Sequence, residues 1–259
     1  MSTIEWKAFL IPYEQAVEEL KVKFKSIRKE YRKKNEYSPI EFVTGRVKEI
    51  SSILEKANKF NIPDDRIMFE MEDICGIRIM CQFVDDITKV VNIIRSRKDM
   101  QIMYEKDYVT NVKNSGYRSY HIIIKYPVSM AEEQKEIIAE VQIRTLAMNF
   151  WATIEHSLNY KYKHEIPEDI KMRLKTAADA AFQLDEHMLG IKDEIKDAQK
   201  LFEVKSSIVS NIIRNIMVIT SIGKLSDAEV YKSKLNQLIN EGEVFELNNL
   251  LDSTEKTLK

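Results

Sequence analysis

Two acidic residues stand in positions where a carboxylate needs an electrostatic partner. Glu140 lies in the middle of an alternating apolar segment, on the same predicted strand face as Gln142. A carboxylate there costs free energy unless a metal, a cation or a proton offsets its charge. Asp73 comes just before Gly76 and an earlier predicted strand, where it could also be a simple turn residue. Because two carboxylates from separate strands can hold one Mg²⁺ together with substrate phosphates, we predict a magnesium site at Asp73 and Glu140.

Basic residues at helical spacing form a second feature, a candidate track for phosphates. Lys48, Ser52 and Lys56 stand at positions i, i+4 and i+8 of a predicted helix that follows Gly45, and Arg46 belongs to the same stripe. Such a stripe is often only a solvated helix face, so both interpretations stay open. The chain has 6 glycines, and no two of them have the spacing of a glycine-rich phosphate loop. Any phosphate must therefore be bound by side chains and metal.

A third feature is a short basic segment around Gly116. The glycine allows a tight turn, which predicts Tyr117 at an exposed loop tip beside Lys113 and Arg118. A tyrosine in that setting can stack on a nucleobase, although it is more often an ordinary surface residue. His121 begins the next predicted strand and could be either a core histidine or part of a site.

Apolar periodicity predicts an α+β fold with a mixed sheet in the middle of the chain. Residues 4–34 have the three-to-four spacing of a helix, whose surface becomes basic from residue 21 onward. From Gly76 the period changes to two, which is typical of strands. Heptad spacing from Ala177 to Phe202 predicts an apolar seam that needs a partner helix. We expect strands over 77–84, 101–110, 119–126 and 137–144, and helices over 86–97, over 146–162, from 167 onward and in two or three short pieces after about 205.

Composition and charge exclude several classes of protein. The 259 residues carry 40 Lys and Arg against 41 Asp and Glu, so no global field attracts nucleic acid or a membrane. No apolar stretch reaches the roughly 20 residues of a membrane span, and no signal peptide is evident. The 2 cysteines, Cys75 and Cys81, lack the spacing of a zinc site, which favours a cytoplasmic protein with reduced thiols.

Four segments together resemble the signature blocks of the RelA/SpoT alarmone synthetase domain. The resemblance covers roughly residues 5–205, and its last segment is similar to small alarmone synthetases of the RelQ type. It implies a nucleotidyltransferase-like mixed sheet of about five strands, flanked by helices and followed by long C-terminal helices. The segments are EDICGIR at 72–78, GYRSYH at 116–121, EVQIRT at 140–145 and NFWATIEHSL at 149–158.

The resemblance implies a GTP/GDP pyrophosphokinase. Such an enzyme uses Mg²⁺ to transfer pyrophosphate from ATP to the ribose 3′-hydroxyl of GTP or GDP, and it releases (p)ppGpp and AMP. The long stringent-response enzymes also carry a hydrolase with a His-Asp metal motif. No His-Asp pair occurs in this chain, which suggests synthesis without hydrolysis.

By position, the resemblance also implies a role for each candidate residue. Asp73 and Glu140 would bind Mg²⁺, and Glu140 would also take the proton of the 3′-hydroxyl. Tyr117 would stack on guanine, and Asn149 would read the guanine edge. The other contacts would be Lys113, His121 and Gln142 in the GTP/GDP site, Arg46 and Arg78 on the adenine of ATP, and Lys48, Ser52 and Lys56 on the ATP phosphates.

The resemblance further implies an assembly. RelQ-like enzymes form homotetramers with a central cleft that binds the product pppGpp as an activator. That cleft would form at Lys21, Lys25, Phe42 and Thr44, although a basic helix can also be simply solvated. We divide the chain into a synthetase domain at 1–205 and a helical extension of unknown role at 206–259.

Two other functions stay open from the sequence. A relative with the same fold could act on another 3′-hydroxyl, that of ATP or of a tRNA end, although Asn149 and the RelQ-like segment favour guanine. Alternatively, the basic N-terminal helix could bind single-stranded RNA in a regulator whose catalysis is lost or secondary. The intact pair of Asp73 and Glu140 favours an enzyme, because a pure binding module does not need it.

Overall fold

The computed structural model describes residues 5–161, 167–241 and 243–258. Internal contacts group the chain into two compact units, residues 1–189 and residues 190–259. The division falls within one continuous helix, α6 (Glu168–Ser221), so the boundary that we place at residue 205 also lies inside this helix.

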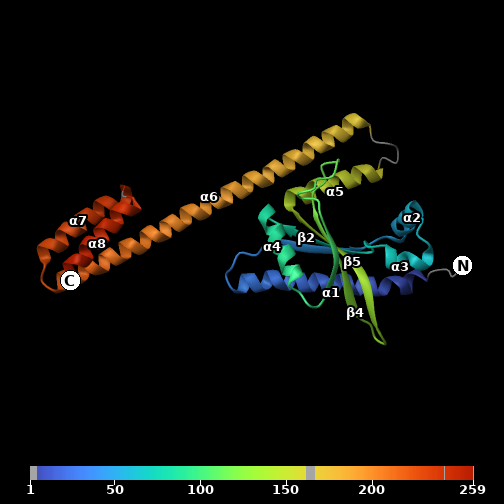
Figure 1. Ribbon diagram of the computed structural model, residues 1–259, viewed down its shortest axis with the longest axis horizontal. Helices are drawn as coiled ribbons and strands as arrows, with labels where there is room; N and C mark the ends of the chain where they lie inside the picture. Colours follow the sequence, from blue (N-terminus) through green and yellow to red (C-terminus); the bar gives the residue numbers. More distant parts are fainter. Residues whose placement is uncertain (1–4, 162–166, 242, 259) are drawn as a thin grey trace. The chain divides into compact units, whose positions relative to one another are not determined.

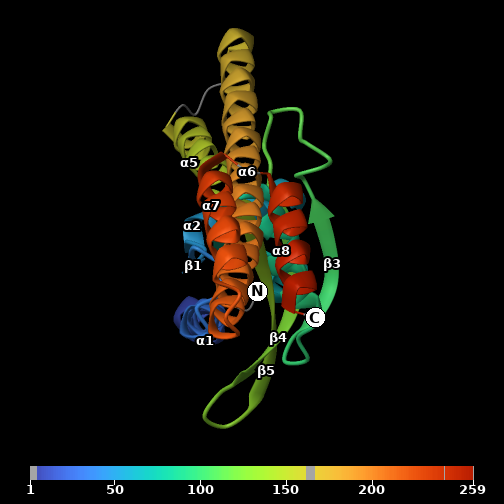
Figure 2. The same ribbon diagram turned by 90° about the vertical axis from the view of Figure 1, so that its left-hand side faces the viewer.

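The first unit is built on a five-stranded mixed sheet, visible from two directions in Figures 1 and 2. The strand order is β1-β2-β5-β4-β3; β2 pairs with β5 in parallel, and the other pairs are antiparallel. This architecture confirms the predicted α+β class with about five strands. The strands are β1 (Phe42–Val47), β2 (Cys75–Cys81), β3 (Gln101–Asp107), β4 (Tyr120–Ser129) and β5 (Gln134–Thr145).

Helices precede, connect and follow these strands. The α1 helix, which the sequence predicts over 4–34, begins at Trp6 and ends at Lys33. The first unit also contains α5 and the start of α6, and the second unit contains the rest of α6 with α7 and α8. The remaining bounds are α2 (Ile50–Phe60), a 3₁₀ turn at Asp64–Arg66, α3 (Ile67–Glu70), α4 (Val84–Arg95), α5 (Leu146–Lys161), α7 (Leu225–Glu241) and α8 (Val244–Leu258).

The predicted helix after Gly45 is wrong at its start, because residues 42–47 form the edge strand β1. Alternate residues of this strand pack inward, and Val43 is buried. Gly45 lets α1 approach closely: an added Cβ would lie 2.8 Å from Ile77 and 2.9 Å from Val17. Arg46 therefore belongs to a strand rather than to a helical stripe, and only Ser52 and Lys56 lie on α2.

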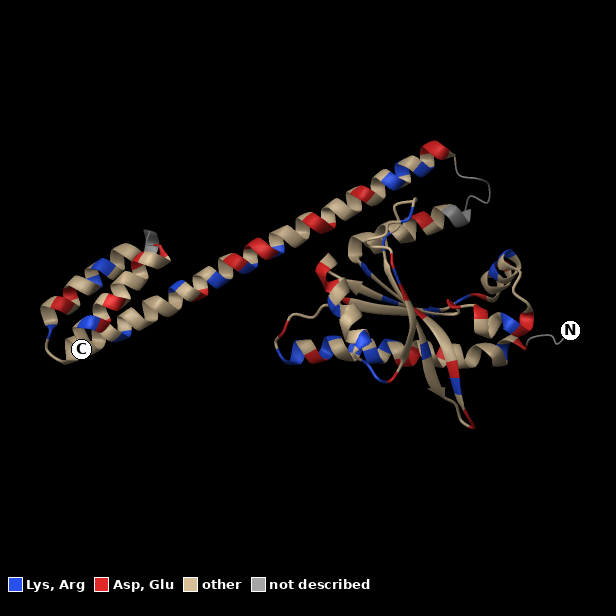
Figure 3. Ribbon diagram, viewed as in Figure 1, with Lys and Arg blue, Asp and Glu red and all other residues tan. Residues whose placement is uncertain are grey.

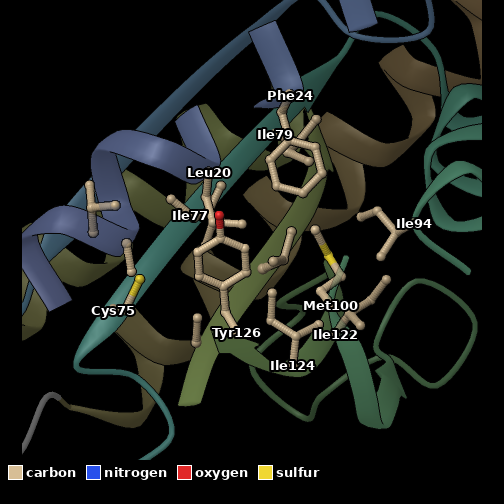
Figure 4. Close-up of a cluster of buried hydrophobic side chains, with 14 of the residues drawn as sticks. Leu20, Phe24, Cys75, Ile77, Ile79, Ile94, Met100, Ile122, Ile124 and Tyr126 are labelled. Atoms are coloured by element: carbon tan, nitrogen blue, oxygen red, sulfur yellow. The ribbon is translucent and has the colours of Figure 1, made fainter. Parts of the chain in front are cut away.

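The main core lies between one face of the sheet and the helices α1 and α4. Apolar residues of α1 recur every third or fourth position, and apolar residues of β2, β4 and β5 alternate, so both sets face the same layer. Figure 4 shows Leu20 and Phe24 of α1 together with Ile77 and Tyr126 of the sheet. Because this face is fully covered, the alternating polar residues of the same strands point to the opposite face.

The second unit has a small core of its own between the end of α6, α7 and α8. Its buried residues are Ile208, Ile212, Leu235, Leu247 and Leu250. Among the described residues, the predicted heptad seam along α6 packs near its start, where Ala181 lies against the cluster of Trp151, but later positions are open: Met188 is 45% exposed and Phe202 is 73% exposed. Within the described residues, no helix has both the length and the apolar character needed to cross a membrane.

We predict that Gly45→Ala destabilises the first unit by about 1–3 kcal/mol, because the new methyl group overpacks the contact between α1 and β1. Chemical denaturation measures this cost. Gly76→Ala is the matched control in the neighbouring strand, since its Cβ would meet only the Arg46 carbonyl oxygen, at 3.7 Å. Equal losses of stability in the two variants would contradict this account of Gly45.

Candidate active site

Strand register places the predicted site residues in rows on the face of the sheet opposite α1 and α4, which we call the open face. Glu140 of β5 lies beside Gly76 of β2, which in turn lies opposite Arg46 of β1. Since Gly76 has no side chain, a space remains between Arg46 and Glu140. In the next row, Gln142 lies between Arg78 on β2 and His121 on β4.

This space is a cavity of about 250 Å³ at the β1-β2-β5 side of the sheet. Two acidic residues from different segments, Asp73 and Glu140, face it together with Arg46 and Arg78. The structure thus brings together residues that the sequence assigns to metal binding, base catalysis and ATP binding. The full lining is Thr44, Gly45, Arg46, Asp73, Gly76, Ile77, Arg78, Glu140 and Gln142.

Asp73 lies in the turn before β2 and is held by two lysines. Lys48 donates a hydrogen bond of 2.8 Å to Oδ2, and Lys56 Nζ lies 2.9 Å from Oδ1. Burial alone would raise the pKa of the Asp73 carboxyl, but the contacts with Lys48 and Lys56 outweigh it and lower that pKa. Asp73 is therefore ionised at neutral pH. Ser52, one turn before Lys56 on α2, is half-buried.

Glu140 accepts a hydrogen-bonding contact on each carboxylate oxygen. His121 Nδ1 lies 2.8 Å from Oε1, and Gln142 Nε2 donates to Oε2 at 2.7 Å. Burial raises the pKa of Glu140, and the nearby charge of Asp73 adds to this effect. The contacts with His121 and Gln142 lower the pKa by more, so the net shift is downward. The carboxylate is thus ionised and lines the cavity.

The sequence predicts Tyr117 at an exposed loop tip, and this prediction is wrong. The structure places Tyr117 in a half-buried position. Its hydroxyl lies 2.8 Å from His121 Nε2, and its ring centroid lies 6.5 Å from that of Trp151. Burial raises the pKa of Tyr117. Lys113 remains exposed, and its Nζ lies 4.9 Å from the Tyr117 ring centroid. The phenol therefore belongs to the sheet network rather than to the surface.

The inward position of Tyr117 follows from contacts between its loop and the start of α6. Gly116 has φ +86°, and an added Cβ would lie 2.6 Å from Ala178. Arg118 donates to Asp179 at 3.0 Å, and its guanidinium carbon lies 4.5 Å from the Phe182 ring centroid. These contacts join residues about 60 positions apart in the chain, which explains why the local sequence predicts exposure.

Asn149 lies in the first turn of α5 and is half-buried. It is not among the residues that line the cavity. Thr145 caps this turn, since its hydroxyl oxygen accepts a hydrogen bond of 3.1 Å from the Met148 amide. Asn149 thus lies on α5 two residues before Trp151, outside the lining of the cavity that holds Glu140.

The four residues predicted for an activator cleft lie on α1 and on β1, which pack against each other. Lys21 and Lys25 lie on α1, and Lys21 is paired with Glu18 at 2.7 Å. Phe42 and Thr44 alternate along β1 on the same face as Arg46, and Thr44 lines the cavity. Thr44 thus belongs both to this predicted cleft and to the cavity that holds Glu140.

Arg144 is a further residue of this network to which the sequence assigns no role. Its place on the same strand face as Glu140 and Gln142 follows from the period of two, but its partners come from another strand and a loop. Arg144 is only 3% exposed, and its Nη2 atom donates to Tyr117 at 2.9 Å and to Gln142.

The donor set fits Mg²⁺ bound together with phosphates. Among the described residues, no cluster of three or more His, Cys, Asp or Glu side chains could hold a metal by itself. Asp73 and Glu140 supply two carboxylates, so the other ligands would be phosphate oxygens and water, which is the usual composition of a nucleotide-bound Mg²⁺ site. The lysines on Asp73 occupy the oxygens that such an ion would need.

Comparisons with known proteins agree with the site. Residues 45–165 match the family described as "Region found in RelA / SpoT proteins". GTP pyrophosphokinase YjbM of Bacillus subtilis is 54% identical over 205 residues, which cover 79% of this chain and 97% of that protein. GTP pyrophosphokinase YwaC of the same organism is 40% identical, with coverage of 74% of this chain and 92% of that protein.

A solved structure is similar in fold as well as in sequence. The small alarmone synthetase 1 of Bacillus subtilis, bound to its product pppGpp, matches with a TM-score of 0.72 and 55% identity, over 74% of this chain and 98% of that chain. This chain belongs to the RelA/SpoT family. The predicted resemblance to the small alarmone synthetases within that family is confirmed.

We predict that a divalent cation binds weakly to the nucleotide-free protein, because Lys48 and Lys56 already neutralise Asp73. Replacing both, as Lys48→Met with Lys56→Met, should tighten binding of Mn²⁺ without nucleotide by about tenfold or more. Titration followed by electron paramagnetic resonance measures the free Mn²⁺. Lys59→Met, at an exposed position of the same helix, is the control. Equally tight binding to the wild type and the double variant would contradict this reading of Asp73.

Proposed function

We propose that this chain is a GTP/GDP pyrophosphokinase, which transfers pyrophosphate from ATP to the ribose 3′-hydroxyl of GTP or GDP and releases AMP. The observation that carries the proposal is the single cavity that joins the carboxylates of Asp73 and Glu140 to the guanidinium groups of Arg46 and Arg78. The high identity to two GTP pyrophosphokinases supports the same activity. We further propose that the chain makes (p)ppGpp without hydrolysing it, since it has no His-Asp pair.

The cationic side chains are suited to hold ATP without a glycine-rich loop. Arg46 and Arg78 present planar guanidinium groups that can stack on adenine. Burial and the neighbouring arginines lower the pKa of Arg78, but a guanidinium stays charged at neutral pH. Lys48, Lys56 and Ser52 offer donors for the polyphosphate, and ATP would draw the two lysines from Asp73. A structure of Bacillus subtilis small alarmone synthetase 1 contains the ATP analogue AMPCPP.

Glu140 is the group best placed to accept the proton of the attacking 3′-hydroxyl. Its two oxygens are oriented by His121 and Gln142, so the carboxylate is fixed before the acceptor arrives. We assign Mg²⁺ to Asp73 and Glu140; when bound, it would neutralise charge on the phosphates during transfer. Tyr117, with Lys113 close to its ring, would stack on the guanine base, and Asn149 of α5 would read the guanine edge.

A second candidate, RNA binding through α1, has weaker support. Figure 3 shows acidic residues among the basic residues of this helix. Lys23 pairs with Asp99 at 2.6 Å, Arg28 pairs with Glu41 at 2.9 Å, and Lys34 pairs with Glu30 at 2.6 Å. These pairs reduce the charge that a phosphate backbone would meet. Transfer to ATP or to a tRNA end remains an alternative choice of acceptor for the same catalytic site.

We also propose that the protein forms a homotetramer in the cytoplasm and is activated by pppGpp near Lys21, Lys25, Phe42 and Thr44. The exposed seam on α6 would supply a helix-packing surface for assembly. Along β1, Phe42 and Thr44 lie on the same face as Arg46, so a ligand at this edge could act on the catalytic cavity through one strand. 

We predict that purified protein forms (p)ppGpp and AMP from labelled ATP with GTP or GDP, and that Glu140→Gln lowers this rate by about 10³-fold or more. The substitution keeps the volume of the side chain and removes its charge. Thin-layer chromatography of reactions with GTP, GDP, GMP, ATP alone or tRNA identifies the acceptor. Glu136→Gln, on an exposed part of the same strand, is the control. Product made only on tRNA or ATP, or wild-type turnover by Glu140→Gln, would overturn the proposal.

Added pppGpp should raise the initial rate with GDP, and Phe42→Ala should reduce that rise while keeping the basal rate. The aromatic ring is 38% exposed and is available to a nucleotide. Phe245→Ala in α8, at a 72% exposed position, should respond as the wild type does. An initial rate that does not change with pppGpp in any of the three proteins would count against an activator site at β1.

A further inference from the structure

Five side chains on the open face of the sheet form a closed ring of hydrogen bonds. The ring runs from Glu140 to His121, from His121 to Tyr117, from Tyr117 to Arg144, from Arg144 to Gln142, and from Gln142 back to Glu140. Three of these side chains come from β5, one from β4 and one from the loop before β4. The ring connects the carboxylate proposed as base to the tyrosine proposed to position guanine.

Two branches of the ring lead from Arg144 to Glu140. When His121 is the neutral tautomer with its proton on Nδ1, every hydrogen bond in both branches is donated in the direction from Arg144 to Glu140. In one branch, Arg144 donates to the Tyr117 oxygen, Tyr117 donates to His121 Nε2, and His121 donates to Glu140. In the other branch, Arg144 donates to Gln142 Oε1 and Gln142 donates to Glu140 Oε2. Arg144 can only donate and an ionised Glu140 can only accept, so these two residues fix the direction of both branches.

Burial makes Arg144 unusual for a residue that serves only packing. It is 3% exposed and makes no ion pair with a carboxylate among the described residues, and its Nε has no hydrogen-bond partner there. An unpaired buried guanidinium is costly, and an apolar side chain of similar length would avoid that cost. Its two hydrogen bonds from Nη2 go to Tyr117 and Gln142, and its guanidinium carbon lies 5.5 Å from the centroid of the Tyr117 ring.

We propose that Arg144 is a positioning residue for pyrophosphate transfer, which sets the Glu140 carboxylate and the Tyr117 ring in one fixed relation. This inference rests on the function proposed above. Arg144 donates to Gln142 Oε1, to which Arg78 Nε also donates at 3.3 Å; these bonds fix the amide orientation of Gln142, and that amide orients Oε2 of Glu140. Through Tyr117 and His121 it orients Oε1. The acceptor ribose would thus meet the base, and its guanine would meet the tyrosine, in a geometry that Arg144 couples, because it alone contacts both branches.

The test compares Arg144→Met, Arg144→Lys and the wild-type protein in steady-state kinetics with ATP and GDP. Methionine keeps the bulk and loses both branches, so kcat should fall by about 10²-fold, the order of loss that misplacing a reacting group causes. KM for GDP should rise severalfold, whereas binding of the ATP analogue AMPCPP should change less than about threefold, because Arg46, Lys48 and Lys56 remain. Lysine can serve one branch at a time, so Arg144→Lys should recover part of kcat.

A double-mutant cycle keeps the test informative if Arg144→Met fails to fold, which thermal denaturation would reveal. Tyr117→Phe removes the phenolic oxygen that links Arg144 to His121 but keeps the ring. Combined with Arg144→Lys, it should cost less than the product of the two single effects, because both act on one branch. Arg95→Met is the matched control, since Arg95 makes two hydrogen bonds to Glu105 outside the ring.

The possible outcomes separate this inference from the function on which it rests. A wild-type protein that transfers no pyrophosphate would refute the proposed function itself. The positioning role would be overturned if the wild type is active and a folded Arg144→Met variant keeps both kcat and the KM for GDP within about twofold of the wild-type values. The positioning role would also be overturned if Arg144→Met and Arg144→Lys lost kcat equally and the effect of Tyr117→Phe on kcat simply multiplied that of Arg144→Lys in the double variant.

Discussion

The parallel pairing of β2 with β5 is the constraint on which the rest of the site depends. It places Glu140 beside Gly76, Gln142 beside Arg78 and Arg144 beside Met80. Because side chains alternate along a strand, a slip of one residue would turn the whole acidic and basic row of β5 into the apolar core. The cover of α1 and α4 on the other face makes that slip costly, so core packing also fixes the chemistry of the open face.

Charges on this open face are arranged so that each acidic group is stabilised before any substrate binds. Two lysines hold Asp73, and a histidine with a glutamine holds Glu140. Burial, and after it the repulsion from neighbouring arginines, lowers the pKa of Arg78 and of Arg144. Such a cluster of cations favours a polyphosphate ligand, which would relieve their mutual repulsion.

The sequence predicts those parts of the fold and site that follow from local periodicity or from continuous motifs. The alternation in β2, β4 and β5 indicates the sheet, and the motif segments identify Asp73 and Glu140. The sequence does not predict the strand β1, because this strand is short. In addition, Val47 and the basic residues after it fit the helical period that continues into α2. The inward position of Tyr117 depends on the contact of Arg118 with Asp179, and no local pattern indicates a contact across that distance.

The most direct test of the central claim is a crystal structure of the protein with Mg²⁺, AMPCPP and GDP. The account predicts one metal ion at about 2.1 Å from carboxylate oxygens of both Asp73 and Glu140. It also predicts the ribose 3′-hydroxyl within about 3 Å of Glu140. A metal ion that contacts neither carboxylate, or a guanosine whose ribose lies away from Glu140, would contradict it.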